Sequence, residues 1–175
     1  MLFALVGLAL QLGKPQYQTG GNVFCSGQGW TIYAYPAEDQ CDLTAEFTDG
    51  ELLTVSYNAK ADTSGIVVTN RHATSLAQDQ KVPLNLVLLS KRAIISQNRV
   101  EFTSHLSGSQ HVLVSDALDV RFIKNFGRAD MFGLFFGNKG VAGSASLLGS
   151  AAATERLIAC AEKAGGIDPL DPFRK

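Results

Sequence analysis

The chain has 175 residues, with fifteen basic against sixteen acidic side chains and a formal net charge of -1. This length fits one domain and is short for two. Lysine and arginine are scattered along the chain rather than clustered. The electrostatic signature of a nucleic-acid-binding protein is therefore missing, and we expect no nucleic-acid partner.

The chain opens on a continuous apolar run, MLFALVGLALQL. The run is shorter than the stretch of about 20 residues that spans a bilayer, and it has the length of the apolar core of a secretory signal. No basic residue precedes it and no A-x-A cleavage site follows it. We interpret residues 1–13 as a signal peptide or apolar N-terminal segment, with a buried strand or helix as the alternative. Residues 14–175 then form a single β-rich domain of a periplasmic or secreted protein, with no transmembrane span.

Alternating apolar and polar residues predict strands along most of the chain. Residues 30–35 form a first strand that ends at Pro36, and residues 41–59 form the clearest hairpin. The Asp-Gly pair in this hairpin suggests a two-residue turn, but only a loop over residues 48–50 brings the apolar side chains to one face. The cross-strand pairs in that register are Ala45 with Leu53, Leu43 with Val55, and Cys41 with Tyr57.

A second hairpin is predicted in VEFTSHLSGSQHVLVS, with its turn centred on Gly108. The register that gathers its valine and phenylalanine side chains on one face sets His105 directly across from His111 on the opposite face. Upstream, we expect a break in strand character at Gln97 and Asn98. The apolar side chains that define this register are Val100, Phe102, Val112 and Val114.

Two helices are expected late in the chain. The first, near residues 116–127, has Ser115 or Asp116 as a candidate cap and Gly127 as its end. The second, near residues 150–164, begins at Ser150, which we expect to act as its cap. Its apolar stripe follows helical spacing and consists of Ala153, Leu157, Cys160, Ala161 and Ala164.

Short turns between strands imply mostly antiparallel pairing. The sequence therefore predicts a mainly β fold, an antiparallel β-sandwich or flattened barrel of about eight or nine strands. The two helices pack on this sheet.

The three cysteines are Cys25, Cys41 and Cys160. Cys41 faces inward on its hairpin and Cys160 faces inward on the last helix, so we predict a disulfide between them. It would close a loop of about 120 residues and constrain the unfolded chain by about 4–5 kcal/mol. A local Cys25–Cys41 bond, or no disulfide if the chain is not exported, are the alternatives.

Candidate sites for chemistry are few. His105 and His111 are weak candidates for metal ligands, because a metal site usually needs three or four ligands and no third is placed beside them. With Asp116 they are also the candidates for a hydrolase site. Gly149 and Ser150, at a helix start, could bind an anion through free backbone N–H groups. The sequence has no nucleotide-binding loop, zinc-protease motif or G-x-S-x-G, so we expect no cofactor and no enzymatic activity.

The run SASLLGSAAATERLIAC, residues 144–160, resembles the strand-then-helix ending of small exported β-proteins of alphaproteobacteria, such as the invasion-associated locus B family. The strand at Trp30, the cysteine at Cys41 and the following hairpin are similar in order. The resemblance, to this family or to a sister family, implies a periplasmic or secreted β-sandwich without known enzymatic activity. The expected function is that of an exported β-domain in the cell envelope, acting through contacts with a protein partner or ligand.

Overall fold

The computed structural model of the chain describes residues 21–47, 51–70, 75–107, 110–137 and 140–167. The predicted N-terminal segment, residues 1–13, and the predicted hairpin loop, residues 48–50, lie outside these ranges. The described residues form the strands β1 (Asn22–Gly27), β2 (Trp30–Tyr35), β3 (Gln40–Glu46), β4 (Leu52–Asn58), β5 (Thr63–Asn70), β6 (Lys81–Ser90), β7 (Ala93–Ser107), β8 (Gln110–Leu118), β9 (Met131–Phe135) and β10 (Val141–Ser146), and the helices α1 (Val120–Phe126) and α2 (Ser150–Ala164). Neither of these helices has the length and apolar character needed to cross a bilayer.

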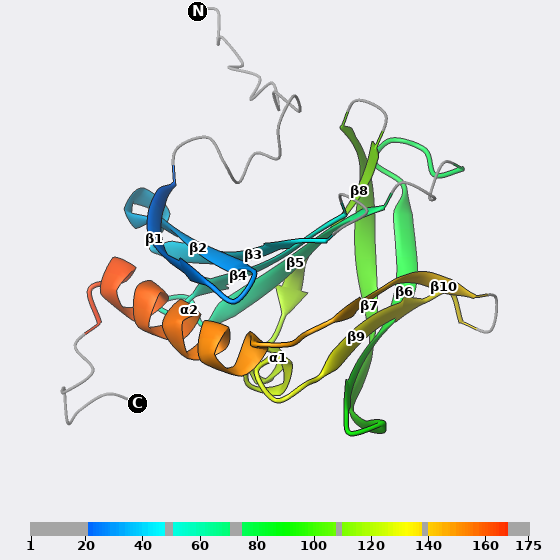
Figure 1. The fold of residues 1–175 in the computed structure, drawn as a ribbon. Helices are drawn as coiled ribbons and strands as arrows, with labels where there is room; N and C mark the ends of the chain where they lie inside the picture. Colours follow the sequence, from blue (N-terminus) through cyan, green and yellow to red (C-terminus); the bar gives the residue numbers. More distant parts are fainter. Residues whose placement is uncertain (1–20, 48–50, 71–74, 108–109, 138–139, 168–175) are drawn as a thin grey trace, which may run out of the picture.

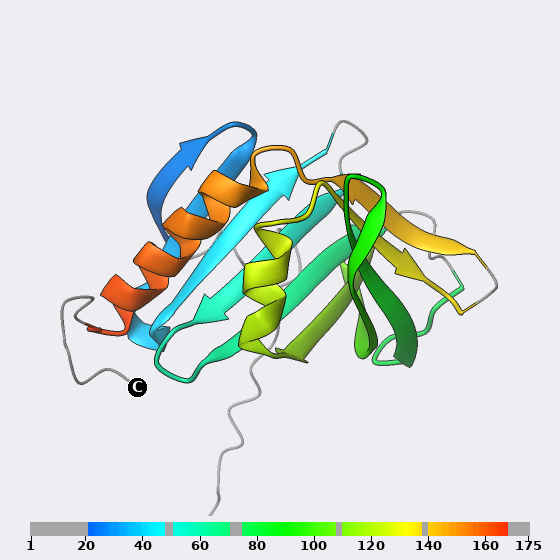
Figure 2. The ribbon, with the colours of Figure 1, turned by 90° about the horizontal axis from the view of Figure 1, so that it is seen from below.

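All these strands belong to one antiparallel sheet in the order β1-β2-β3-β4-β5-β8-β7-β6-β9-β10. Strands that follow one another in sequence pair with one another, except that β5 pairs with β8 and β6 pairs with β9. The sheet bends strongly, and α2 lies against its inner face beside β2 and β3 (Figures 1 and 2). β10 folds back toward β5, where the position of a Cβ on Gly143 lies 3.9 Å from Val68. The predicted mainly β, sandwich-like fold is confirmed, with ten strands because β1 was not recognised as a strand.

The β3–β4 hairpin has the predicted register. Cys41 pairs with Tyr57, Leu43 with Val55 and Ala45 with Leu53. Those six side chains are all buried, because period-two alternation leaves only one register in which every apolar side chain of the two strands faces the core.

The core lies between the bent sheet and the two helices. Trp30 packs edge-on against Phe126 of α1, with ring centroids 5.9 Å apart, and its indole N–H donates to the carbonyl of Leu148 over 3.0 Å. The largest fully buried side chains come from both ends of the sheet and from α1, including Leu43, Leu84, Phe102, Leu113, Ile123 and Leu134. One continuous core therefore joins the whole described domain.

Two sequence expectations in this part of the chain are wrong. β7 runs without a break through Gln97 and Asn98, since β6 pairs with it along its length. The first helix begins at Val120 rather than near residue 116, because β8 continues to Leu118 alongside β5. Asp119, not Ser115 or Asp116, is its cap, and its carboxylate accepts a hydrogen bond from the backbone N–H of Phe122 over 3.3 Å.

Candidate functional site

The two histidines singled out from the sequence lie on opposite faces of the sheet. β7 and β8 pair Leu106 with His111 and His105 with Val112, one residue away from the predicted register. Neighbouring residues on a strand point to opposite faces, so His105 and His111 cannot bind one ion together. The register prediction failed because it placed the side chain of Val112 on the core face of β8. The side chains buried on that face are those of His111, Leu113 and Ser115.

Each histidine has a separate environment. The Nδ1 atom of His105 lies 3.1 Å from Oδ1 of Asp79 and 3.5 Å from the amide nitrogen of Gln78. His111 is buried, and its Nδ1 has no hydrogen-bond partner among the described residues. The part of the chain that the structure describes contains no group of three or more potential metal-ligating side chains. The predicted two-histidine metal site is therefore not formed.

His105 nevertheless lies on a groove, which opens where β7 and β8 separate. The two strands pair only from Thr103 to Ser107 of β7, after which β7 continues beside β6 while β8 continues beside β5. The space between them is a groove of about 530 Å³, which we call the β7–β8 groove. It is lined by Arg99, Val100, Glu101, Thr103, His105, Val114, Ser115 and Asp116.

Charged side chains surround the groove, and only some are paired. Glu101 accepts a hydrogen bond from Nζ of Lys81 over 2.7 Å, and this contact raises the pKa of Lys81. Arg99 on the β7 wall and Asp116 on the β8 wall form no ion pair within the described ranges. The groove thus presents one unpaired cation and one unpaired anion on opposite walls.

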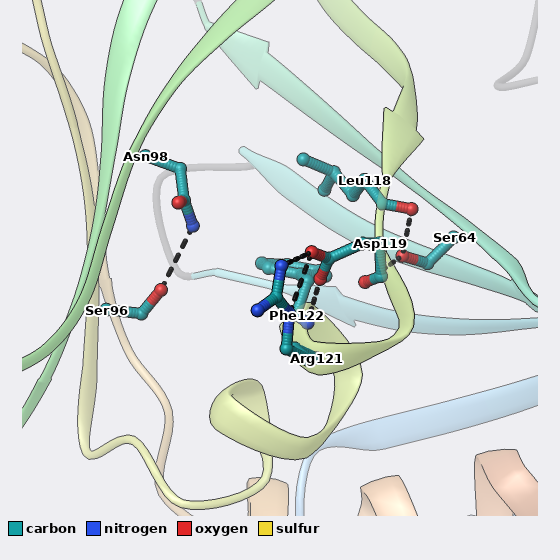
Figure 3. A network of polar contacts seen from close by, with 7 residues as sticks. All are labelled: Ser64, Ser96, Asn98, Leu118, Asp119, Arg121 and Phe122. Carbon is teal, nitrogen blue, oxygen red and sulfur yellow. Dashed lines mark hydrogen bonds and ion pairs between the residues drawn. The ribbon is translucent and has the colours of Figure 1, made fainter.

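The end of β8 is held in place by polar contacts (Figure 3). The hydroxyl of Ser64 on β5 donates to the carbonyls of Leu118 and Asp119, over 3.0 and 3.1 Å. Arg121 donates from Nε and Nη2 to Oδ2 of Asp119, over 3.0 and 2.8 Å, and this guanidinium lowers the pKa of Asp119. These bonds hold the end of β8 against β5 and the start of α1, and they keep β8 apart from β7.

A smaller hollow of about 250 Å³ lies between the β1–β2 hairpin and α2. The unbonded cysteine, Cys25, lines it together with Trp30 and Arg156. Cys41 on β3 and Cys160 on α2 form the predicted disulfide, with their Cα atoms 6.1 Å apart. Cys25 is therefore the spare thiol, and the Cys25–Cys41 alternative is excluded.

Ser150 does not cap the last helix. Gly149 occupies the cap position with φ of +82°, and no side chain caps the helix start. The buried hydroxyl of Ser150 instead donates to the carbonyls of Phe126 and Ala129, over 3.3 and 3.2 Å. Ser150 thus connects α2 to the end of α1, and the predicted capping role is wrong. Anion binding at Gly149 and Ser150 stays a prediction.

One buried carboxyl lies on the opposite face of β3 from Cys41. Asp42 is 1% exposed and accepts a hydrogen bond from the amide of Gln40 over 2.8 Å. Burial raises the pKa of Asp42 to about 6, against the opposing effect of hydrogen bonds from Gln40 and Ser56. Its charged form is therefore disfavoured inside the fold.

Sequence reasoning identified His105 and Asp116 separately but not the groove that joins them. The available signal was the polar alternation of Arg99, Glu101, Thr103 and His105 along β7. That pattern looks the same for a solvent-facing strand and for the wall of a groove, so it could not show which strand lies opposite.

Comparison of the chain with protein-family models, with curated proteins and with solved structures finds no match. The resemblance to the invasion-associated locus B family therefore stays a prediction. The fold and its groove define a bent antiparallel β-domain with one helix tied to the sheet by a disulfide.

Proposed function

We propose that this protein is an exported, non-enzymatic β-domain that acts in the cell envelope by binding another protein through the β7–β8 groove. The observation that carries the proposal is the groove itself. Two strands of one sheet separate there, and the groove is lined by Arg99 and Asp116, two charges of opposite sign that have no ion-pair partner among the described residues. Conformationally fixed clefts with a few free polar groups are the usual sites of recognition.

Export is supported by two features. Disulfides persist in oxidising compartments such as the periplasm, and the Cys41–Cys160 bond joins α2 to β3. The apolar run at the start of the sequence has the length of a secretory signal core. A binding role rather than an enzymatic one is favoured because the sequence carries no nucleotide-binding loop, zinc-protease motif or G-x-S-x-G.

The test is site-specific photocrosslinking in cells that express the full chain. A photoreactive residue is placed at Thr103, which lines the groove, and, as a matched control on the distant edge of the sheet, at Val23 of β1, which is 62% exposed. We expect a defined partner band from position 103 that is absent at position 23. Mass spectrometry of the intact protein under non-reducing conditions shows, from the same sample, whether a leader has been removed and whether the disulfide has formed. A reduced chain that stays in the cytosol, or equal crosslinking from both positions, contradicts the proposal.

A further inference from the structure

We propose that the β7–β8 groove binds its partner as an extended peptide, which adds as a new strand to the free edge of β7. This inference rests on the proposed function and specifies its ligand class. Strand addition to an open sheet edge is a recurring mode of peptide recognition, in which backbone hydrogen bonds provide affinity and alternate side chains provide specificity.

The first support is the direction of the backbone groups of β7. Ser104 donates its N–H to Gln80 over 2.9 Å and accepts from the N–H of Asp79 over 2.7 Å, so its backbone bonds are made on the β6 side. Along a strand, the backbone groups of successive residues point alternately to its two sides. The N–H and C=O groups of Arg99 and Glu101 therefore point into the groove, where β8 no longer pairs with β7.

Pro83 gives independent support for this alternation. It lies on β6 directly across from Glu101, and proline has no N–H to donate. A hydrogen-bonded pair between these two residues is impossible, which agrees with the backbone of Glu101 facing the groove. β9 pairs with β6 only from Asn85 onward. The missing N–H of Pro83 therefore costs no hydrogen bond between β6 and β9.

The second support is that this edge is regular whereas the two outer edges of the sheet are not. The pairing of β1 with β2 is irregular between Val23 and Cys25, and that of β10 with β9 between Val141 and Gly143. Bulges of this kind prevent edge strands from pairing with other chains. In the pairing of β7 with β6 the register shifts between Leu88 and Leu89. It is continuous from Gln97 to Thr103, so this stretch can pair with an added strand.

The third support is charge. Beyond the last β7–β8 pair, Thr103 with Val114, Arg99 of β7 and Asp116 of β8 both line the groove. Lys81 already pairs with Glu101, which leaves Arg99 and Asp116 for the ligand. Side chains two residues apart share one face of a strand. The groove therefore fits an extended segment that carries an acidic residue for Arg99 and a basic residue, on the same face of the ligand strand, for Asp116.

The test uses three synthetic peptides with alternating threonine and valine and a variable centre, Glu-x-Lys, Lys-x-Glu or Gln-x-Gln. Their binding to the purified full chain is measured by fluorescence anisotropy. We expect the oppositely charged peptides to bind at least tenfold more tightly than the neutral one. An equal affinity for all three, or no binding of any of them, overturns the proposal.

A matched pair of variants isolates the backbone contribution. Glu101→Ala and Glu101→Pro remove the same charge, but only Glu101→Pro also removes the N–H that points into the groove. We expect the proline variant to bind at least tenfold more weakly than the alanine variant, with thermal unfolding confirming that both are folded. Equal binding by the two folded variants overturns strand addition. If a partner is still crosslinked from position 103, the proposed function survives that outcome.

Amide hydrogen exchange on the unmodified protein gives a readout that needs no variant. In the free chain the amides of Arg99 and Glu101 should exchange quickly and those of Val100 and Phe102 slowly. Addition of the charged peptide should slow the first pair and leave the second unchanged. Slow exchange of Arg99 and Glu101 in the free chain would mean that a segment of the chain itself, or a second copy, already occupies the edge, and would overturn the proposal.

Discussion

The half of the sheet beneath α2, which we call the covered half, and the half around β7, which we call the open half, differ in how completely their strands are paired and covered. Beneath α2, β2 and β3 are hydrogen-bonded on both sides, and the helix is tied to them by the disulfide. Around β7, a strand edge is left open, and Arg99 and Asp116 are left without ion-pair partners in the described residues. One half of the sheet is thus closed by strand pairing, a helix and a disulfide, whereas the other keeps a stretch of β7 that β8 does not pair with.

The largest effect should come from breaking the covered half at its covalent link. Removing the disulfide with Cys41→Ala and Cys160→Ala frees a loop that spans a sequence separation of 119. We expect a loss of up to about 5 kcal/mol in the free energy of unfolding, since longer loops lose more entropy when closed. Urea denaturation without reductant measures it, and Cys25→Ala, which removes the spare thiol, serves as the control. Equal midpoints for these variants would show that the disulfide is not what holds this half together.

A substitution at Ser150 distinguishes a helix cap from a link between helices. Aspartate is as good a cap as serine, but here the side chain is buried against the carbonyls of Phe126 and Ala129. We expect Ser150→Asp to cost about 3–5 kcal/mol because it buries an unpaired charge, and Ser150→Ala to cost about 1–3 kcal/mol. Thermal unfolding measures both. An aspartate variant as stable as the original chain would restore the capping role.

The third prediction concerns the pH dependence of the covered half. The pKa of Asp42 is raised to about 6 in the fold from an ordinary value of 3.8, so the native state holds this proton more tightly than the unfolded state does. Its contribution is most favourable below about pH 4, is lost as the pH rises to about 6, and is constant above. We expect Asp42→Asn to remove this dependence and to raise stability at pH 7 by up to about 3 kcal/mol.

Urea midpoints for the original chain and the Asp42→Asn variant, measured between pH 4 and pH 8, test this prediction. Gln40, which donates to the carboxyl, provides the control through Gln40→Ala. Loss of that donor should raise the pKa of Asp42 further and steepen the pH dependence. Parallel pH profiles for Asp42→Asn and the original chain would contradict the assignment.

The smallest effect on stability should come from the open half. Lys81 and Glu101 are exposed side chains in one ion pair, and exposed pairs contribute little because water and salt screen them. We expect Lys81→Gln to leave the urea midpoint unchanged. The same variant should alter peptide binding in the groove, because it leaves the charge of Glu101 unpaired. A marked loss of stability would show that the open half also supports the fold.

The sequence predicted much of the covered half and little of the groove. The inward positions of Cys41 and Cys160 followed from the periodicity of their own elements, and so did their disulfide. The short strand β1, by contrast, has exposed Val23 and Phe24 and no buried alternation, so it carried no such signal. The β7–β8 register was wrong because Val112 and Val114 form an apolar pattern on the outer face, where the sheet bends.

By itself, the sequence determined the β class, the register of the β3–β4 hairpin, the span of α2 and the inward faces of Cys41 and Cys160. These features depend on side chains a few residues apart, whose periodicity of two or 3.6 residues is readable locally. Only the tertiary structure decided that β5 pairs with β8, that β7 and β8 separate, and that Ser150 bonds to α1 rather than capping α2. Those outcomes depend on where distant strands meet as the sheet bends around its core, and no local pattern encodes that meeting.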